Sequence, residues 1–411
     1  MSHAIRYAAR KGGSLAVLAL DLDRFTIVND TFGHALGDRL IATVAGRLQN
    51  AVRAIDTVAR VGGDEFAIVQ VDVKEPNGAR RLARRLIEAL SQPFDLDGQE
   101  VAVSVSVGLA LYPQEGSTDA LLLKRADAAL YTAKADGGSA FRFFEPEMDA
   151  RIRHRHRLET DLRHAIGTDQ ITLFYQPQLA CSTGAITGFE ALLRWHHPVH
   201  GAIAPADFIP IAEETGLIVG LGRWVIEQAC ATAATWAAPL RVAVNLSPVQ
   251  FRGPDLPTQI AEILRRTGLP ADRLELEVTE TLLTNTKQAL AILQRLRAQG
   301  IHITLDDFGT GYASLNHLRS FPFEKLKIDQ SFVQYLGADH KALSLVKTIL
   351  ALAANLDLTA VAEGVETDQQ LEILRGLRCG EVQGFLFGRA MPREDIDQYL
   401  DHHRQVGGSH A

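Results

Sequence analysis

The sequence predicts a two-domain α/β protein, and three observations carry that prediction. From residue 171 onward, short segments rich in Val, Ile and Leu alternate with longer amphipathic segments, a pattern typical of strands followed by helices. Before residue 141 the predicted elements follow a different order, with a hairpin at their centre. Between the two halves, the stretch 141–167 is a strand-like segment followed by a charged helical run. We therefore expect a first domain at 1–147, a linker helix region at 148–168 and a second domain at 155–405.

The first domain is predicted to be a sheet covered by helices. Its expected elements, in chain order, are a buried strand at 15–23, a helix at 34–54, a hairpin at 58–71, a helix at 77–91, a strand at 101–111 and a helix at 117–135. The hairpin turns at Gly62-Gly63, and paired glycines favour the tight turns that join antiparallel strands.

The second domain offers eight strand candidates: 171–179, 185–193, 242–246, 274–278, 302–306, 325–328, 359–362 and 382–386. Eight strands that alternate with helices predict a closed barrel. Only the segment 180–184 separates the first two strands, whereas a parallel pair needs a crossover of about a dozen residues. We therefore expect that pair to be antiparallel.

Composition and charge narrow the class of protein. With 46% hydrophobic and 22% charged residues in 411, the chain can bury large cores. A formal charge of −7, from 42 Lys+Arg against 49 Asp+Glu, argues against binding of duplex nucleic acid through a broad basic face. No apolar run reaches the roughly 18 residues of a membrane span, so we expect no membrane segment. The three cysteines are far apart and form no CxxC, which fits a reducing cytoplasm.

Polar residues stand at the predicted C-terminal ends of successive barrel strands, where such a barrel has its catalytic mouth. They are Glu190, Asn245, Glu277, Asp306, Asp307, Lys327, Asp329, Glu363, Glu366 and Gln383. A single acid could be a solvated strand end, but their recurrence predicts a functional site. Hard oxygen ligands indicate Mg²⁺ or Mn²⁺ and metal-assisted hydrolysis of a phosphoester, in which adjacent Asp306-Asp307 can bridge two ions about 4 Å apart.

Two other clusters are given no functional role. The histidines of WHHPVHG, residues 195–201, lie in a Pro-Gly loop outside the set of strand ends, so we favour a loop over a zinc site there. The run of arginines at 151–157 is interpreted as a solvated helix rather than as a nucleotide contact.

Seven motifs of the second half, in this order and spacing, resemble the EAL-type cyclic di-GMP phosphodiesterases. They are GFEALLRW, AVNLSP, LELEVTE, LDDFGTGYASL, KLKID, AEGVE and QGFLFG. The resemblance covers nearly all of 155–400 and implies a TIM-like (β/α)8 barrel that hydrolyses cyclic di-GMP to linear pGpG with two Mg²⁺ or Mn²⁺ ions.

The same resemblance implies roles for individual residues. The first ion would be bound by Glu190, Asn245, Glu277 and Asp306, and the second by Asp306 with Asp307. Lys327 would orient the attacking water, Glu363 would act as base or support a ligand, and Gln383 would complete the water and metal shell. Gln176, Arg194 and Glu366 would contact substrate. Glu280 would tether the loop 307–315, whose glycines also fit an ordinary flexible turn.

In the first half, the hairpin motif Gly62-Gly63-Asp64-Glu65-Phe66, with DLDRFTIVND at 21–30 and GHALGD at 33–38, resembles the GGDEF diguanylate cyclases. This implies an α+β nucleotide-cyclase-like domain in which Asp21, Asp64 and the Leu22 carbonyl hold Mg²⁺ on GTP. The other implied GTP contacts are Asn29, Asp38, Gly62, Gly63, Glu65 and Lys134. An inhibitory product site is implied at Arg53, Asp56 and Arg84, although an exposed ion pair at a helix end would have the same sequence.

The first half departs from the cyclase pattern at three places. The DxLTGLxNR segment that usually precedes the first strand is lacking. Thr26 stands where the family has a lysine, and Gly138 stands where the family has an arginine four residues after Lys134. We therefore expect GTP to be bound as a regulator or turned over weakly. The alternatives are a bifunctional enzyme with dominant cyclase output and a non-catalytic cyclic di-GMP receptor. Because both families commonly work as dimers, a homodimer is expected.

Overall fold

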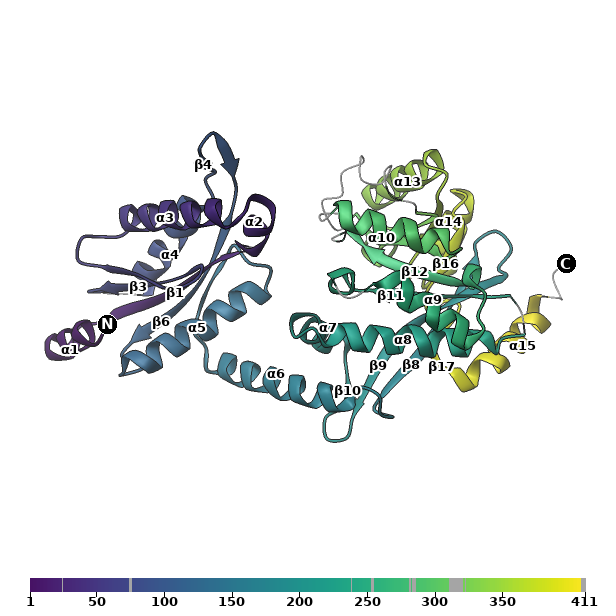
Figure 1. Cartoon of the computed structure of the whole chain (residues 1–411), viewed down its shortest axis with the longest axis horizontal. Helices are drawn as coiled ribbons and strands as arrows, with labels where there is room; N and C mark the ends of the chain where they lie inside the picture. Colours follow the sequence, from purple (N-terminus) through teal and green to yellow (C-terminus); the bar gives the residue numbers. More distant parts are fainter. Residues whose placement is uncertain are drawn as a thin grey trace. The chain divides into compact units, whose positions relative to one another are not determined.

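The chain forms two compact units, Met1–His156 and Arg157–Ala411, in a computed structural model (Figure 1). The structure describes residues 1–411 except 24, 74–75, 238, 253–254, 281, 283–285, 310–320, 322 and 408–411. Each unit has its own sheet and its own hydrophobic core.

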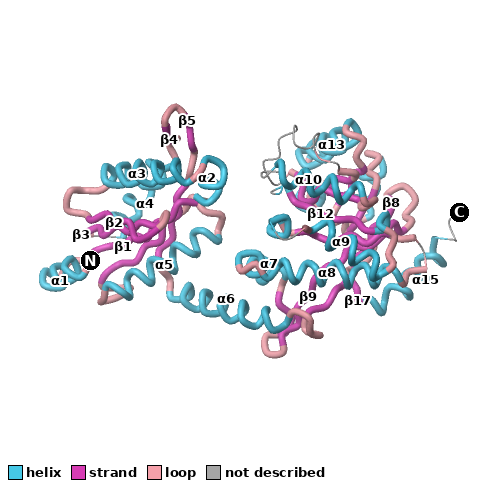
Figure 2. Tube along the Cα trace, in the orientation of Figure 1, coloured by secondary structure: helices cyan, strands magenta, loops and turns pink. Residues whose placement is uncertain are grey.

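The first unit is a five-stranded sheet with helices on both faces (Figure 2). Its strand order is β2 (Thr57–Gly62), β3 (Glu65–Val71), β1 (Leu15–Asp23), β6 (Ser104–Tyr112) and β7 (Phe141–Phe143). Even-numbered residues of β1 share a core with α3 (His34–Ala51) and α4 (Pro76–Leu90), whereas odd-numbered ones share a core with α1 (Ser2–Lys11) and α5 (Asp119–Ala135). The alternation of side chains along one strand thus supplies two apolar faces.

The predicted elements of this unit are confirmed, and three more are present. These are α1, α2 (Phe25–Phe32) and a hairpin of β4 (Phe94–Leu96) and β5 (Gln99–Val101). The hairpin turns at Asp97-Gly98, where both residues have positive φ, 59° and 82°. Asp-Gly favours this turn, and because the hairpin takes residues 99–101, β6 begins at Ser104 rather than at 101.

The second unit is a closed barrel, as predicted. The eight strands are β8 (Ile171–Ala180), β9 (Ile186–His197), β11 (Arg241–Leu246), β12 (Leu274–Thr279), β13 (His302–Phe308), β14 (Lys325–Ile328), β15 (Thr359–Ala362) and β16 (Glu381–Gln383). β8 pairs antiparallel with β9, as expected, and also with β16, which closes the ring. The last strand ends at Gln383 instead of residue 386.

Helices surround the barrel strands (Figures 1 and 2). They are α7 (Pro205–Glu214), α8 (Leu217–Ala234), α9 (Leu256–Thr267), α10 (Thr286–Ala298), α12 (Gln330–Val333), α13 (His340–Asn355), α14 (Asp368–Gly376) and α15 (Ile396–Gly407). Two short strands, β10 (Gly201–Ile203) and β17 (Met391–Pro392), pair with β9 and β8.

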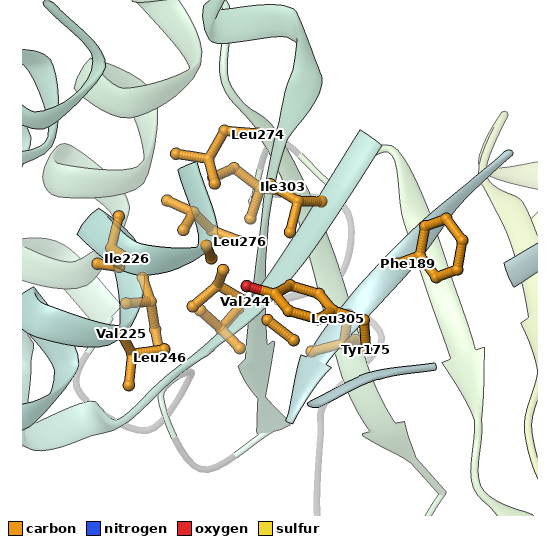
Figure 3. Packing of buried hydrophobic residues seen from close by; sticks show 14 of the residues in the cluster. Tyr175, Phe189, Val225, Ile226, Val244, Leu246, Leu274, Leu276, Ile303 and Leu305 are labelled. Atoms are coloured by element: carbon orange, nitrogen blue, oxygen red, sulfur yellow. The ribbon is translucent and has the colours of Figure 1, made fainter. Parts of the chain in front are cut away.

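Barrel strands alternate apolar and polar residues, and this alternation separates the core from the site. Val244 and Leu246 of β11, Leu274 and Leu276 of β12, and Ile303 and Leu305 of β13 gather with Val225 and Ile226 of α8 (Figure 3). The residues between them, among them Asn245, Glu277 and Thr304, have the opposite orientation because successive side chains of a strand point to opposite faces. The polar set is therefore directed into the barrel.

The linker is a single helix, α6 (Pro146–Ala165), with a few buried residues toward each end. Met148 belongs to a core of the first unit, and Leu158, Leu162 and Ala165 belong to the barrel core. The run 151–157 between them is exposed or only partly buried, which agrees with our interpretation of it as a solvated helix. None of the helices formed by the described residues has the length and apolarity needed to cross a membrane.

We predict that Gly108→Ala destabilises the first unit. A Cβ at residue 108 of β6 would lie 2.0 Å from the Ala126 carbonyl oxygen and 2.1 Å from the Leu130 nitrogen of α5. Helix and strand must therefore move apart, and we expect a loss of at least about 2 kcal/mol in the free energy of unfolding, measured in urea. The control is Gly46→Ala in α3, where a Cβ has no neighbour within 4 Å. It should be neutral or up to about 1 kcal/mol stabilising, and equal effects would contradict the packing argument.

Candidate active site at the barrel mouth

The Lys327 ammonium lies among four carboxylates at the C-terminal ends of the barrel strands. Its Nζ is 2.6 Å from Glu363 Oε1, 2.9 Å from Glu277 Oε2, 3.3 Å from Glu190 Oε2 and 3.5 Å from Asp306 Oδ1. Lys327 is only 1% exposed. The carboxylates come from β9, β12, β13 and the end of β15, so one side chain gathers acids that are far apart in the sequence.

Three of these acids, Glu190, Glu277 and Glu363, have pKa values that this environment shifts in different ways. Burial alone would raise the pKa of Glu190, but Lys327 and hydrogen bonds from Gln383 and Asn245 hold it below its usual value. Burial, and then the Glu190 carboxylate, raise the pKa of Glu277 well above its usual value. Burial also raises the pKa of Glu363 to about 7, against the effect of Lys327. One ammonium therefore does not balance the negative charge gathered at this site.

A bulge in β13 turns two consecutive carboxylates toward the same place. The pairing of β13 with β14 shifts register between Leu305 and Phe308, and Asp307 has a φ of +54°. Asp306 Oδ1 accepts a hydrogen bond from the Asp307 amide at 2.9 Å. Oxygen atoms of Asp306, Asp307 and Glu363 all lie within 4.8 Å of one another. A regular strand would have sent the two aspartates to opposite faces.

The donor set fits a divalent metal ion. Every member is an oxygen ligand, which Mg²⁺ and Mn²⁺ prefer. The Glu277 side chain is fully buried, and its Oε1 has no hydrogen-bond partner among the residues that the structure describes. An unpaired buried carboxylate oxygen is costly, and a cation is one way to satisfy it.

Amide side chains orient Glu190 from both sides. Asn245 Nδ2 donates to Glu190 Oε1 at 2.7 Å, and Gln383 Nε2 donates to Glu190 Oε2 at the same distance. Gln178, which is 2% exposed, donates to Gln383 Oε1 at 3.1 Å and so directs the amide group of Gln383 toward Glu190. In this arrangement Gln383 acts by holding Glu190. Gln178 was not among the residues predicted from the sequence, although a polar residue two positions after Gln176 in an apolar strand was a usable signal.

The site opens into a cleft of about 340 Å³. Of the predicted substrate contacts, Gln176, Arg194 and Glu366 all line it. Burial lowers the pKa of Arg194 from its usual value, against the effect of Glu190. The cleft is also lined by residues that were not predicted from the sequence: Gln330, Gly364, Gly384 and Phe385. Phe385 is half exposed, and the Arg389 guanidinium lies 4.2 Å from the centre of its ring.

Three further predicted residues have distinct positions. Glu280 Oε1 accepts a hydrogen bond from the Gly309 amide at 2.7 Å, which agrees with a tether to the start of the loop, whereas 310–315 lie outside the described residues. Asp329 caps α12 by accepting from the Ser331 amide. His197 Nδ1 accepts from two backbone amides, so it is not a free metal ligand.

The first unit also has a cleft, of about 230 Å³. It is lined by the predicted residues Asp21, Glu65 and Lys134, and also by Asp127 and Tyr131, which the sequence did not single out. Asp21 stands opposite Glu65 in the register of β1 and β3, and Lys134 Nζ lies 2.6 Å from Asp21 Oδ2. Burial and the acids Asp64 and Glu65 raise the pKa of Asp21, against the effect of Lys134.

The other residues expected to bind nucleotides lie elsewhere in the first unit. The side-chain oxygen of Asn29 in α2 approaches Gly37, which precedes the exposed Asp38 in α3, and neither Asn29 nor Asp38 lines the cleft. The hairpin turns at Gly63-Asp64, one residue later than predicted, because Gly62 still belongs to β2 and pairs with Glu65. Gly62 and Gly63 are exposed, with open space where a Cβ would stand, and the Leu22 side chain is buried. A residue with a Cβ at Gly138 would be strained, because φ is +75° and Asp23 lies 3.2 Å away.

The expected inhibitory site is only partly formed. The Asp56 carboxylate accepts from the Arg53 amide at 3.0 Å and from the Val71 amide at 3.2 Å. It therefore closes the turn before β2. The Arg53 and Arg84 side chains are exposed, and within the described residues neither forms an ion pair with Asp56.

The fold and the acidic site define the second unit as a (β/α)8-type barrel whose polar residues stand at its strand ends. Residues 159–390 match the EAL domain family, and residues 1–140 match the family described as diguanylate cyclase, GGDEF domain. The chain belongs to the EAL domain family and carries a GGDEF domain before the barrel, which confirms the resemblance seen in the sequence.

Several known proteins are similar over nearly the whole chain. The bifunctional diguanylate cyclase/cyclic di-GMP phosphodiesterase MucR of Pseudomonas aeruginosa is 45% identical over 401 residues, which are 96% of this chain and 58% of MucR. An uncharacterized signaling protein of Caulobacter vibrioides is 49% identical over 401 residues, 97% of this chain and 50% of that protein. The chain thus spans 50% and 58% of the length of these two curated relatives.

Among solved structures, the phosphodiesterase of PaMucR in complex with c-di-GMP has a TM-score of 0.57 and 44% identity. The alignment covers 58% of this chain and 99% of that chain. The barrel unit is therefore similar to that phosphodiesterase in sequence as well as in fold.

We predict that Lys327→Met destabilises the barrel. Methionine removes the only cation within 4 Å of the four carboxylates among the described residues, so buried negative charges are left uncompensated. We expect the free energy of unfolding of the metal-free protein to fall by about 3–5 kcal/mol, measured in urea at neutral pH. Lys341→Met on the exposed surface of α13 is the control and should change it by less than about 0.5 kcal/mol. Similar values for both variants would refute the role of Lys327 as counter-ion.

Proposed function

We propose that the barrel unit hydrolyses cyclic di-GMP to linear pGpG with two bound Mg²⁺ or Mn²⁺ ions. The observation that carries this proposal is the set of strand-end carboxylates around Lys327, with the Asp306, Asp307 and Glu363 oxygen atoms within 4.8 Å of one another. The names of the relatives support the choice of substrate, since MucR is described as a cyclic di-GMP phosphodiesterase and its phosphodiesterase binds c-di-GMP.

The residues divide the reaction between them. Glu190, Asn245, Glu277 and Asp306 would hold one ion, and Asp306 with Asp307 the other. When bound, divalent ions supply Lewis-acid stabilisation of the phosphate and a water that is activated at neutral pH. Lys327 would orient that water while Glu363, 2.6 Å from Nζ, accepts its proton or supports its position.

Substrate contacts would fix which bond breaks. Arg194, with its planar fork of donors, suits a phosphate oxygen, and Gln176 and Glu366 would contact the rest of the dinucleotide from the same cleft. Attack of water on one phosphorus breaks one P–O bond to the ribose and opens the ring. The product is pGpG, in which the departing ribose oxygen has become a new hydroxyl and the attacked phosphorus a terminal phosphate.

The first test is a time course of the chain with cyclic di-GMP and Mg²⁺ or Mn²⁺, with products separated by chromatography. Accumulation of pGpG supports the hydrolase. Tight binding of cyclic di-GMP without hydrolysis would instead favour the non-catalytic receptor.

We predict that Asp306→Asn abolishes hydrolysis while the fold is retained. Asparagine keeps the shape but removes the charge of the residue expected to contact both ions, so we expect a loss of at least about 100-fold in kcat. Asp357→Asn, an exposed loop residue with a φ of +56° that Asn tolerates, is the matched control and should retain full activity. Hydrolysis by Asp306→Asn within tenfold of the unaltered chain would contradict the two-metal assignment.

We further propose that the first unit binds GTP with Mg²⁺, as a regulator or a weak cyclase, and that the chain forms a homodimer. The cleft with Asp21, Glu65 and Lys134 supports the nucleotide site, because two carboxylates can hold a cation and a lysine can hold phosphate. Dominant cyclase output is the alternative, because the relative MucR is described as a bifunctional diguanylate cyclase and phosphodiesterase. The homodimer is proposed from the resemblance to the two families, and light scattering tests it.

We predict that Asp21→Asn weakens GTP binding in Mg²⁺ by at least about tenfold in calorimetric titration, because it removes a metal ligand beside the phosphates. The control is Asp72→Asn, an exposed residue after β3. Unaltered affinity in Asp21→Asn would place GTP elsewhere. If the unaltered chain converts GTP to cyclic di-GMP faster than it hydrolyses that product, the bifunctional alternative replaces the regulatory one.

A further inference from the structure

A second set of polar residues lies one step below the site, on the same strands. Glu275 precedes Glu277 by two residues in β12, Thr304 precedes Asp306 in β13, Lys325 precedes Lys327 in β14, and Glu381 precedes Gln383 in β16. Residues two apart point to the same face of a strand and lie about 6.6 Å apart along it. Four strands thus carry a lower polar layer, defined here as Glu275, Thr304, Lys325 and Glu381, beneath the site.

The lower layer is closed by direct contacts. Lys325 Nζ lies 2.8 Å from Glu275 Oε2 and 2.7 Å from Glu381 Oε2, and Thr304 Oγ1 donates to Glu275 Oε1 at 2.7 Å. Lys325, Glu275 and Thr304 are at most 3% exposed. Burial alone would lower the pKa of Lys325, but the two carboxylates raise it.

The two Lys325 contacts join strands that are not neighbours in the sheet. β13 lies between β12 and β14, and β15 lies between β14 and β16. The backbone ladder fixes each strand only against its neighbours, whereas the Lys325 contacts reach across the interior of the barrel. They therefore restrain the distances between the strand ends that carry Glu277, Lys327 and Gln383.

Stability alone does not account for such a layer. Replacing a buried ion pair by apolar side chains of similar volume is often neutral or stabilising, so an apolar plug would serve a barrel core equally well. Ion pairs and charged hydrogen bonds hold specific groups together, unlike apolar contacts: Lys325 donates a hydrogen bond to Glu381 and forms an ion pair with Glu275. A site whose ligands come from several strands depends on distances of that kind.

We propose that Lys325, through Glu275 and Glu381, is a positioning residue that braces β12, β14 and β16 so that the side chains of the catalytic layer converge. The inference rests on the proposed phosphodiesterase function for its kinetic consequence. Its metal-binding consequence depends only on the oxygen ligands of the barrel mouth.

The test is Lys325→Met in the full chain, with three measurements. Binding of Mn²⁺ is titrated by calorimetry, kcat and KM for cyclic di-GMP are measured separately, and the urea midpoint of the metal-free protein is recorded. We expect the Kd for Mn²⁺ to rise at least tenfold and kcat to fall at least tenfold, with KM changing less than threefold. A misplaced metal site affects the reaction more than it affects contacts to the distant parts of the substrate.

Two controls separate positioning from loss of charge and from loss of stability. Glu381→Gln keeps a carbonyl that accepts from Lys325 and should bind Mn²⁺ within threefold of the unaltered chain, whereas Glu381→Leu should resemble Lys325→Met. If Lys325→Met does not fold, the two Glu381 variants decide between the outcomes. The Glu381 side chain is 12% exposed, and replacing it leaves the contact between Lys325 and Glu275 intact. Ile260→Ala, in the buried face of α9, should lower the urea midpoint without changing the Kd.

Each outcome supports or overturns the brace. If Lys325→Met and Glu381→Leu lower the urea midpoint but keep the Kd and kcat within twofold, the layer is only stabilising and the proposal is overturned. If the unaltered chain binds Mn²⁺ but does not hydrolyse cyclic di-GMP, the proposed function fails and the Kd values still decide the brace. If it binds no Mn²⁺, both fail together.

Discussion

The burial of one ammonium group among four carboxylates is the constraint on which the barrel unit depends. Lys327 is 1% exposed and lies within 4 Å of acids from four parts of the chain, which only a closed ring of strands can bring together. The antiparallel β8, paired on both edges, closes that ring. Apolar residues that alternate with the acids pack against the helices, so the core that stabilises the barrel also determines where the acids point.

The second constraint is local and lies in β13. A regular strand cannot present two consecutive carboxylates to one place, and the shift of register at Asp306-Asp307 removes that restriction at the cost of a positive φ at Asp307. The bulge precedes Gly309, whose amide is held by Glu280 of the neighbouring β12 region. The chain is therefore restrained by hydrogen bonds on both sides of Asp307, which favours its positive φ.

The sequence predicted the eight strands and most of the residues at the barrel mouth because both follow from periodicity and from position at strand ends. It predicted less where direction depends on tertiary contacts. Asp329 has the sequence position of a strand-end acid but caps a helix. The sequence also did not indicate Gln178, which donates to Gln383 while Gln383 donates to Glu190. The buried residues toward each end of α6 were missed because its apolar residues are few and belong to two different cores. Phe385 was missed because the strand predicted to contain it ends two residues earlier.

In both units a lysine contacts an acidic residue at the end of a strand, but the two lysines differ in their exposure to solvent. The Lys134 side chain is 39% exposed, so its contact with Asp21 is screened by solvent and contributes little, and the lysine can leave the acid for an incoming phosphate at small cost. Lys327 has no such freedom, because if it moved away several buried carboxylates would be left without a counter-ion. In the exposed pair, Lys134 can release Asp21 and bind a ligand instead. In the buried site, Lys327 stays in place, so any ligand must bind in addition to it. Lys327 is therefore a fixed part of the buried site, and Lys134 is the lysine that can change partner if, as proposed, a nucleotide binds beside it.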